Sequence, residues 1–213
     1  MKQLTVALAK GRLAEKTVEL LEKCGVNCAP LKKDTRKLVL CDADEKYKFI
    51  FVKPADVPTY IERGVADIGV VGKDTLLEEG KDIYEMLDLK FGLCSMCVAG
   101  FERKSESITQ NNLRVASKYV NIAREFYASK GMDVDIVKLT GSVELGPIIG
   151  LSDVIVDIVE SGKTLEANGL TVLEEICKLS ARLVVNKVSL KTKNAEIMPL
   201  IEKISAIIEE KTV

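Results

Sequence analysis

Residues 154–165 read Val-Ile-Val-Asp-Ile-Val-Glu-Ser-Gly-Lys-Thr-Leu, an apolar run that leads directly into a Ser-Gly-Lys-Thr turn. The run is nearly continuous, as in a strand covered on both faces, and only Asp157 interrupts it. Residues 165–168 have the pattern of a short helix that Gly169 ends. A buried strand followed by a turn and a helix is typical of an α/β protein, in which ligands bind beyond the carboxyl ends of the strands.

The turn after this strand has the groups that bind a phosphate. Ser161 and Thr164 supply hydroxyls, and Lys163 supplies an ammonium. Gly162 lets the backbone N–H groups at the helix start approach an anion. Asp157, inside the strand, is an acceptor suited to the hydroxyls of a sugar. A carboxylate followed by such a loop is what a phosphoribosyl diphosphate site requires.

Two other interpretations of the turn deserve comparison. Gly162-Lys163-Thr164 matches the end of a Walker A loop, but Asp157 stands where that motif needs its first glycine, five residues before Gly162. The spacing therefore argues against a nucleoside-triphosphatase. The segment can also be an ordinary strand-turn-helix connection, in which Gly and Ser serve the turn alone. The local sequence leaves this second alternative open.

Short apolar strands alternate with helical patterns along the rest of the chain. Strands are expected at residues 4–9, 38–41, 49–52, 68–71, 113–116, 134–138 and 154–158. Helices are expected at about 13–23, 55–63 and 195–211. This alternation predicts an α/β protein with a mainly parallel sheet.

Two longer apolar stretches, residues 91–99 and 181–188, stand apart from this series. Each is long enough to run as a strand through a hinge between two lobes. We therefore expect a discontinuous first lobe, residues 1–90 with 180–213, and an inserted second lobe, residues 91–179. The second lobe would contain the phosphate-binding turn.

Composition limits the possible functions. The 31 basic and 32 acidic residues nearly cancel, so no overall charge favours nucleic acid or a membrane as a partner. The segment before Lys10 is too short for a signal peptide or a spanning helix, and we expect a cytoplasmic protein. Histidine is absent, which excludes imidazole catalysis, Ser-His-Asp triads and His-ligated metals.

The six cysteines do not have the spacing of a disulfide scaffold. Cys94 and Cys97 form a CxxC pattern, but it lies in an apolar run where strand alternation directs the two thiols to opposite faces. We expect buried thiols rather than a redox or metal site.

A family resemblance is spread over nearly the whole chain. Between residues 144 and 165 it rests on Glu144, Gly150, Ser152, Ile155, Asp157, Ile158, Ser161, Gly162, Thr164 and Leu165. Elsewhere it rests on residues 10–13 (Lys-Gly-Arg-Leu), 53–60 (Lys-Pro-Ala-Asp-Val-Pro-Thr-Tyr), 66–69 (Ala-Asp-Ile-Gly), 72–74 (Gly-Lys-Asp) and 141–145 (Gly-Ser-Val-Glu-Leu). In this order the motifs closely resemble the signature of the ATP phosphoribosyltransferase family, the first enzyme of histidine biosynthesis.

The resemblance implies a two-lobed fold similar to type II periplasmic binding proteins. It also implies the condensation of ATP, at adenine N1, with 5-phosphoribosyl 1-diphosphate to give N1-(5-phosphoribosyl)-ATP and diphosphate. Glu144 and Asp157 would then face the ribose hydroxyls, although Glu144 can also be an acid that favours a helix start. The 5′-phosphate would be bound by Ser161, Gly162, Lys163, Thr164 and Leu165.

The basic residues near the chain start are candidates for the other phosphates. Lys10, Gly11 and Arg12 lie between the first strand and first helix, where a glycine lets the backbone approach an anion; alone they could be a solvated helix start. The resemblance adds Arg36 and Lys53. We expect Lys10, Arg12 and Lys53 to act in catalysis and Gly11 and Arg36 to bind substrate. The family usually has Arg where this chain has Lys53. A guanidinium, which can form two parallel hydrogen bonds to the diphosphate, is thus replaced by a single ammonium charge.

Cofactor and partner expectations also follow from the resemblance. Mg²⁺ would be held by the diphosphate and water, with a protein carboxylate optional and no dedicated protein metal site. Longer members carry an additional regulatory domain, whereas this sequence ends at Val213 and resembles the short form. The short form implies a separate regulatory subunit resembling histidyl-tRNA synthetase, with a homodimer of this chain inside a hetero-oligomer. The alternative is a two-lobed small-molecule binding module without catalysis, because a fold alone does not decide function.

Overall fold

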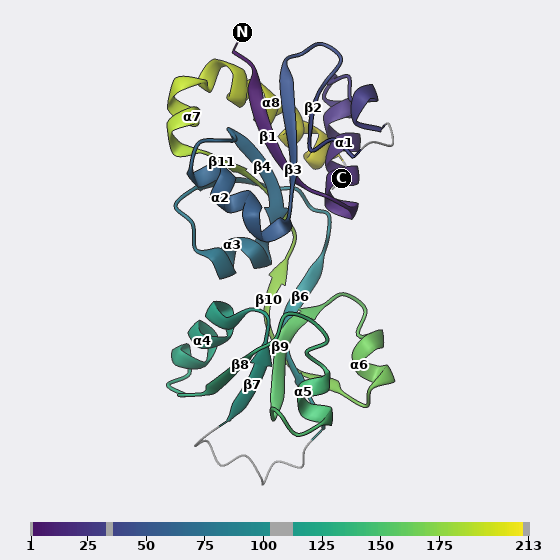
Figure 1. Cartoon of the computed structure of the whole chain (residues 1–213), viewed down its shortest axis with the longest axis vertical. Helices are drawn as coiled ribbons and strands as arrows, with labels where there is room; N and C mark the ends of the chain where they lie inside the picture. The colour runs from purple at the N-terminus through teal and green to yellow at the C-terminus, as the bar shows by residue number, and fades with distance from the viewer. Residues whose placement is uncertain (1, 33–35, 103–112, 211–213) are drawn as a thin grey trace. The chain divides into compact units, whose positions relative to one another are not determined.

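The computed structural model describes residues 2–32, 36–102 and 113–210. Its internal contacts divide the chain into two compact units. Unit 1 comprises Met1–Gly92 and Ser180–Val213, so it includes both the purple and the yellow ends of the colour scale in Figure 1; unit 2 comprises Leu93–Leu179. Within the described ranges, none of the helices is both long enough and apolar enough to span a membrane.

Unit 1 is built on a six-stranded mixed sheet. The strand order is β2 (Val39–Cys41), β3 (Tyr47–Val52), β1 (Leu4–Ala9), β4 (Ile68–Gly72), β11 (Ala181–Val185) and β5 (Tyr84–Asp88). β1 pairs in parallel with β3 and β4, while β2 and β11 are antiparallel to their neighbours. The strands β1, β3, β4 and β5 therefore end at the same edge of the sheet.

Helices cover both faces of this sheet (Figure 1). Alternate residues of β1 explain the two layers, because Leu4, Val6 and Leu8 enter one apolar cluster while Ala7 and Ala9 enter another. The first cluster contains residues of α1 (Arg12–Lys23) and α8 (Asn194–Glu210); the second contains residues of α2 (Val57–Glu62) and, at its margin, α3 (Lys73–Glu79). The remaining helical turns of unit 1 are η1 (Ala29–Lys32), η2 (Pro54–Asp56) and α7 (Lys187–Thr192).

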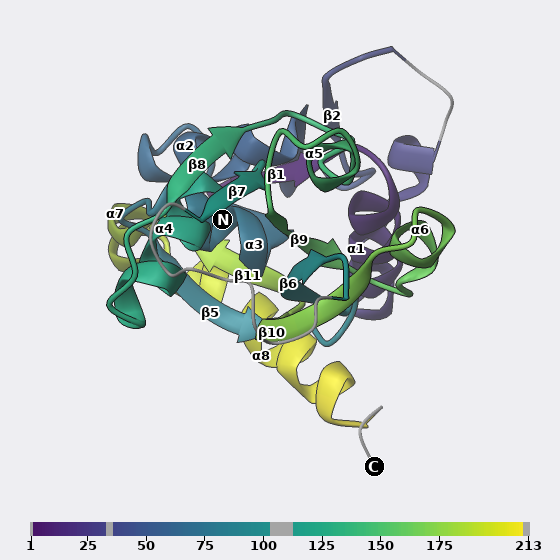
Figure 2. The same cartoon turned by 90° about the horizontal axis from the view of Figure 1, so that it is seen from below.

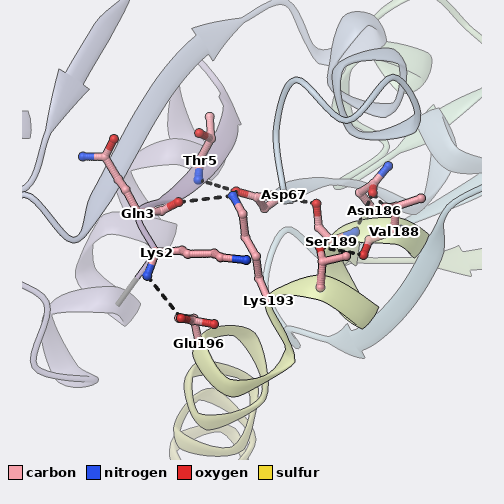
Figure 3. A network of polar contacts seen from close by, with 10 residues as sticks. Lys2, Gln3, Thr5, Asp67, Asn186, Val188, Ser189, Lys193 and Glu196 are labelled. Carbon is pink, nitrogen blue, oxygen red and sulfur yellow. Dashed lines mark hydrogen bonds and ion pairs between the residues drawn. The ribbon is translucent and has the colours of Figure 1, made fainter.

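A buried polar network joins the two chain segments of unit 1 (Figure 3). The carboxylate of Asp67, only 4% exposed, accepts hydrogen bonds from the Thr5 backbone N–H at 2.8 Å and the Ser189 hydroxyl at 2.6 Å. Lys193 donates to the same carboxylate at 2.7 Å and to the Gln3 carbonyl at 3.2 Å. Strand β1, the start of β4 and the segment around α7 are thus bonded through one side chain.

Unit 2 contains a five-stranded sheet. Its order is β10 (Thr171–Leu179), β6 (Cys94–Gly100), β9 (Val154–Val159), β7 (Arg114–Ser117) and β8 (Asp135–Lys138). β9, β7 and β8 are parallel, and β6 is antiparallel to both β9 and β10. Figure 2 shows α4 (Val120–Ser129) on one face and α5 (Leu145–Ile148) and α6 (Lys163–Ala167) on the other.

Side chains of the central strand β9 pack on both faces of this sheet. Val154 and Val156 pack into the cluster that contains α4, whereas Ile155 packs with Val143 and Leu165 on the opposite face. Because side chains alternate along a strand, Asp157 belongs to the face of Ile155. The carboxylate that interrupts the apolar run therefore lies on the α5 and α6 side.

Most predicted elements are confirmed. The seven expected strands correspond to β1, β2, β3, β4, β7, β8 and β9, and the expected helices correspond to α1, to η2 with α2, and to α8, whose expected last residue lies outside the described residues. The short helix expected at 165–168 begins two residues earlier, at Lys163. Within each sheet most of the described strands run in one direction, in line with the predicted mainly parallel arrangement, while β2, β6 and β11 run against their neighbours.

One predicted strand is wrong in its length. Residues 181–188 do not form a single strand, since β11 ends at Val185 and the side chain of Asn186 accepts the N–H groups of Val188 at 2.9 Å and Ser189 at 2.8 Å. This cap starts α7. The chain instead returns to unit 1 directly after β10, a strand that the sequence did not predict.

Candidate active site

Unit 2 contains a pocket of about 280 Å³ at the end of β9. It brings together every site residue that the sequence predicted for this part of the chain: Glu144, Asp157, Ser161, Gly162, Lys163, Thr164 and Leu165. The pocket is completed by Cys97, Ala99, Ile155, Ile158, Val159 and Glu160. It therefore has an apolar floor with hydroxyl, ammonium and carboxylate groups around it.

The turn in this pocket owes its shape to Gly162. This residue has φ +73° and ψ −7°, a left-handed conformation that favours glycine, and a methyl group built on it would meet no atom within 4 Å. The first helical hydrogen bond of α6 runs from the Glu166 N–H to the Gly162 carbonyl at 3.0 Å. The N–H groups of Lys163, Thr164 and Leu165 precede that bond and are outside the helical ladder.

The turn is anchored where it enters α6. Leu165 is 5% exposed and packs in the same cluster as Ile155, which fixes the start of α6 against the sheet. The Asn168 side-chain amide also donates to the Thr164 carbonyl at 2.8 Å. Ser161, Lys163 and Thr164 themselves are exposed, so their hydroxyl and ammonium groups are accessible to a ligand.

Asp157 and Glu144 reach the pocket from different elements. Asp157 is half-buried on β9, directly opposite Cys97 of β6 in the strand register. Glu144 is half-buried just before α5, where buried Val143 holds the backbone in the apolar cluster. Glu144 occupies the cap position of α5 but makes no side-chain cap hydrogen bond. Its role in the pocket and the alternative, an acid whose charge favours the helix start, both stay predictions.

Cys97 lines the pocket but was not among the predicted site residues. Cys94 packs beside the cluster containing α4 while Cys97 lines the pocket, so the expected opposite orientation of the two thiols is confirmed. Cys97 is 3% exposed, and burial, with the nearby charge of Glu175, raises the pKa of its thiol. The alternation of side chains along β6 was not enough to place Cys97 on the Asp157 face. That placement also requires the register of β6 with β9.

The basic candidates of unit 1 gather at the edge where its parallel strands end. Ala9 pairs with Val52 in the register of β1 and β3, so Lys10 and Lys53 follow adjacent strand ends. The Lys10 N–H donates to the Val52 carbonyl at 3.4 Å. Lys10 and Lys53 are both exposed. Two cations are therefore presented side by side at this edge.

Arg12, Gly11 and Arg36 lie at the same edge. Gly11 has φ +106° and precedes α1, whose first residue is the exposed Arg12. The Phe51 N–H donates to the Leu38 carbonyl at 2.9 Å, which places the start of β2 beside the end of β3. Arg36 is exposed and lies two residues before Leu38, next to residues 33–35, which are outside the described part of the chain.

A second pocket, of about 580 Å³, adjoins these residues in unit 1. Lys10 and Gly11 are among its lining residues, whereas Arg12, Arg36 and Lys53 are not. Ala14, Val18 and Phe51 give it an apolar wall. The site residues predicted for unit 1 thus share a strand edge, but only two of them share this cavity.

A metal ion held by protein alone is not indicated. In the parts of the chain that the structure describes, no three Cys, Asp or Glu side chains converge as such a site would require. Glu144 and Asp157 nevertheless present two carboxylates to one pocket. This donor set fits a hard cation whose other ligands are phosphate oxygens and water.

The sequence of the chain matches a known family model. The model described as "HisG: ATP phosphoribosyltransferase" matches residues 53–206, which cover most of the chain and parts of both units. The chain belongs to the ATP phosphoribosyltransferase family. ATP phosphoribosyltransferases catalyse the first step of histidine biosynthesis, and the predicted enzyme class, a pentosyltransferase, is confirmed.

Full-length relatives agree with this assignment. An ATP phosphoribosyltransferase from Lachnoclostridium phytofermentans is 54% identical over 213 residues, which cover 99% of each chain. A solved structure, the ATP phosphoribosyl transferase (HisG:HisZ) complex from Thermotoga maritima, has a chain 38% identical with a TM-score of 0.83, covering 98% of this chain and 100% of that one.

The ATP phosphoribosyltransferase fold is shared with binding proteins. The periplasmic aliphatic sulphonate binding protein SsuA from Escherichia coli matches 98% of this chain and 73% of its own with a TM-score of 0.62. At 14% identity this likeness concerns the fold alone. It confirms the predicted two-lobed type II periplasmic-binding-protein-like class.

Proposed function

We propose that the pocket of unit 2 binds 5-phosphoribosyl 1-diphosphate and that the chain transfers the phosphoribosyl group from it to N1 of ATP. The observation that carries this proposal is the convergence of Glu144, Asp157 and the turn around Gly162 on one cavity. The N–H groups outside the helical ladder, with the Thr164 hydroxyl, are suited to the 5′-phosphate. The two carboxylates are suited to accept from the ribose hydroxyls.

The chemistry requires little more than charge stabilisation. Transfer passes through a cationic, oxocarbenium-like sugar while diphosphate leaves, so the enzyme must neutralise the leaving group rather than create a strong nucleophile. Adenine N1 already has a lone pair, and the absence of histidine is therefore no obstacle. Mg²⁺ would supply Lewis acidity to the leaving diphosphate, and Glu144 or Asp157 could hold it as an optional carboxylate ligand.

The basic residues of unit 1 are assigned to the phosphates of the substrates. Lys10, Arg12 and Lys53 would neutralise phosphates of the substrates, and Gly11 and Arg36 would contribute to substrate binding. Their common position at one strand edge supports this role. We also propose that the division into residues 1–90 with 180–213 and residues 91–179 separates a lobe that anchors ATP from a lobe that holds the ribosyl donor.

A regulatory partner is part of the proposal. The similar chain from Thermotoga maritima is described in a complex with HisZ. We propose that this chain also assembles with a regulatory subunit, one resembling histidyl-tRNA synthetase, as a homodimer within a hetero-oligomer. Histidine inhibition would then require both proteins.

Diphosphate release tests the function directly. The purified chain, with and without the candidate partner, is mixed with Mg²⁺, ATP and 5-phosphoribosyl 1-diphosphate, and diphosphate is measured with a coupled assay. Release that depends on both substrates supports the proposal. Thermal stabilisation by the ligands without any turnover, in the presence of the partner, would favour the binding-module alternative.

A further inference from the structure

A further cavity of unit 1 is lined by none of the proposed substrate residues. It has a volume of about 600 Å³ and is bordered by the outer face of α1, the end of α8 and the segment that follows β5. Its lining residues are Lys16, Glu19, Leu20, Lys23, Leu89, Lys90, Phe91 and Ile208. Glu19 also borders the pocket beside Lys10, and the other seven do not.

The cavity has an apolar floor and a cationic rim. Leu20 and Leu89 are 6% and 3% exposed and belong to the main core of unit 1, while Phe91 and Ile208 pack at its margin. The rim carries three lysines and the carboxylate of Glu19. The Lys90 ammonium is paired with Asp88 at 2.9 Å, so the positive charge offered to a ligand comes from Lys16 and Lys23. This combination matches a small organic anion with an apolar body, whose ring or chain can cover the floor while its charge meets the ammonium groups.

Two lysines of α1 line the cavity. Lys16 and Lys23 are seven residues apart, so they lie on the same side of the helix. The Lys16 ammonium lies 6.0 Å from the centroid of the Phe91 ring. An anion above the apolar floor would therefore have a cation at each end of the cavity.

Residues 89–91, which line the cavity, belong to the segment that leaves unit 1 and are hydrogen-bonded to the segment that returns to it. The Leu89 N–H donates to the Ala181 carbonyl at 2.9 Å, and the Ala181 N–H donates to the Phe91 carbonyl at 2.9 Å. Asp88 accepts from the Ser180 hydroxyl at 2.7 Å and from the Lys90 N–H at 3.0 Å. The chain leaves unit 1 after Gly92 and re-enters it at Ser180.

We propose that this cavity is a regulatory site for a small organic anion with an aromatic or aliphatic body. A ligand there contacts residues 89–91 directly, and these residues share backbone hydrogen bonds with the returning segment. Occupancy then biases the conformation of both connecting segments, which alters turnover without contact with either substrate.

The binding test uses 8-anilinonaphthalene-1-sulfonate, an apolar anion that fluoresces when bound. We expect saturable binding of one dye per chain, with at least tenfold weaker affinity in the Lys16→Gln/Lys23→Gln variant. The Lys191→Gln/Lys203→Gln variant loses the same charge at exposed helical positions outside the cavity and should bind as the wild type does. The uncharged analogue N-phenyl-1-naphthylamine should bind at least tenfold more weakly. Equal dye affinity in both variants overturns the site.

The proposed effect of the bound anion on turnover has its own test. Saturating dye should change kcat or the KM for either substrate at least twofold in the wild type and in the Lys191→Gln/Lys203→Gln variant, but not in the Lys16→Gln/Lys23→Gln variant. Dye that binds in the cavity without altering either constant overturns the regulatory role. Because the titration needs no turnover, its failure is distinguishable from a failure of the proposed transferase reaction.

Discussion

At the scale of single residues, Asp157 is the group on which donor recognition most depends. It interrupts an otherwise apolar strand and lies in the pocket with the turn around Gly162. The Asp157→Asn variant keeps the shape of the side chain but weakens acceptance from the ribose hydroxyls. We expect kcat/KM for 5-phosphoribosyl 1-diphosphate to fall about 10- to 100-fold, measured by steady-state kinetics.

The control for this variant is Asp135→Asn, the same change at an exposed carboxylate on β8 of the same sheet. Its kinetics should match the wild type, and both variants should keep the wild-type far-ultraviolet circular dichroism spectrum. Wild-type kinetics for Asp157→Asn would show that this carboxylate is structural.

Thr164 tests the phosphate end of the same pocket. Replacing its hydroxyl in Thr164→Val should weaken donor binding by about 1–3 kcal/mol if the lost hydrogen bond is charge-assisted. Thr164→Ser keeps the hydroxyl and should restore most of the affinity. Isothermal titration calorimetry with the donor alone measures both. An unchanged dissociation constant for Thr164→Val removes this side chain from the site.

Sequence could identify these residues because each one breaks a local pattern. A carboxylate in a buried strand and a Gly-Lys-Thr turn at its end are visible without coordinates. Cys97 breaks no pattern in its apolar strand. Its place opposite Asp157 depends on the register of β6 with β9, a long-range property that local sequence does not contain.

At the scale of elements, the turn before α6 depends on one left-handed residue. Gly162→Ala forces a side chain into φ near +73°, which should lower the free energy of unfolding by about 1–2 kcal/mol. Gly131 is a matched control, with φ +69° after α4 and no atom within 4 Å of a built methyl group. Gly131→Ala should lose a similar amount, measured by urea unfolding.

The two glycine variants should differ in ligand binding. Only Gly162→Ala displaces the N–H groups that precede the first helical bond of α6, so only it should weaken the donor's affinity, by about tenfold or more. Equal affinities in the two variants would contradict the proposed use of this turn.

The end of β5 should contribute pH-dependent stability. Burial tends to raise the pKa of Asp88, but hydrogen bonds from Ser180 and Lys90 and the charge of Arg182 outweigh it and lower the pKa to about 2. A lowered pKa stabilises the fold above the unfolded-state value near 3.8, and this stabilisation is lost as the pH falls through 2.

The corresponding variant is Asp88→Asn, which should be less stable than the wild type at pH 6. The difference in urea midpoint should shrink between pH 4 and pH 2, because the wild type becomes protonated there. Asp44→Asn changes an exposed carboxylate of the same unit, 3.8 Å from Lys46, and should show little difference at any pH. A pH-independent difference for Asp88→Asn would contradict the mechanism.

Strand β10 shows why some elements escaped prediction. Its register with β6 shifts twice, between Val172 and Glu174 and between Glu175 and Cys177. Each irregularity breaks the two-residue alternation by which strands are recognised. The strand is identifiable only through its partner, whereas β1 and β9 are evident from their own apolar runs.

At the scale of the whole molecule, unit 1 is assembled from two distant chain segments, and Asp67 joins them. Asp67→Ala leaves the Thr5 N–H and the Ser189 hydroxyl without their acceptor and removes the carboxylate partner of Lys193. We expect a loss of about 3 kcal/mol in unfolding free energy. Chemical denaturation followed by circular dichroism measures it.

Hydrogen exchange can locate that loss. Faster exchange in Asp67→Ala should concentrate in β1, β4 and α7, while the strands of unit 2 exchange at wild-type rates. Asp44→Ala serves as the surface control. It should change the unfolding free energy by no more than about 0.5 kcal/mol and leave the exchange rates at their wild-type values. A uniform increase over both units would contradict a local role for the network.

The α/β class and the two-lobed family fold were predictable from the sequence because strand and helix patterns alternate and several motifs recur in a fixed order. Strand β10, which leads the chain back to unit 1, was not predicted, because its edge position and its pairing with β6 are tertiary features.

The pairing of Cys94 with Leu179 has a consequence for how this protein can be rebuilt. The entry and exit points of residues 93–179 are neighbours, so this segment behaves as a cassette with two adjoining splice points. A chimera that exchanges it for the corresponding segment of a relative leaves the strand pairing of the host sheet intact, because all six strands of that sheet lie outside residues 93–179.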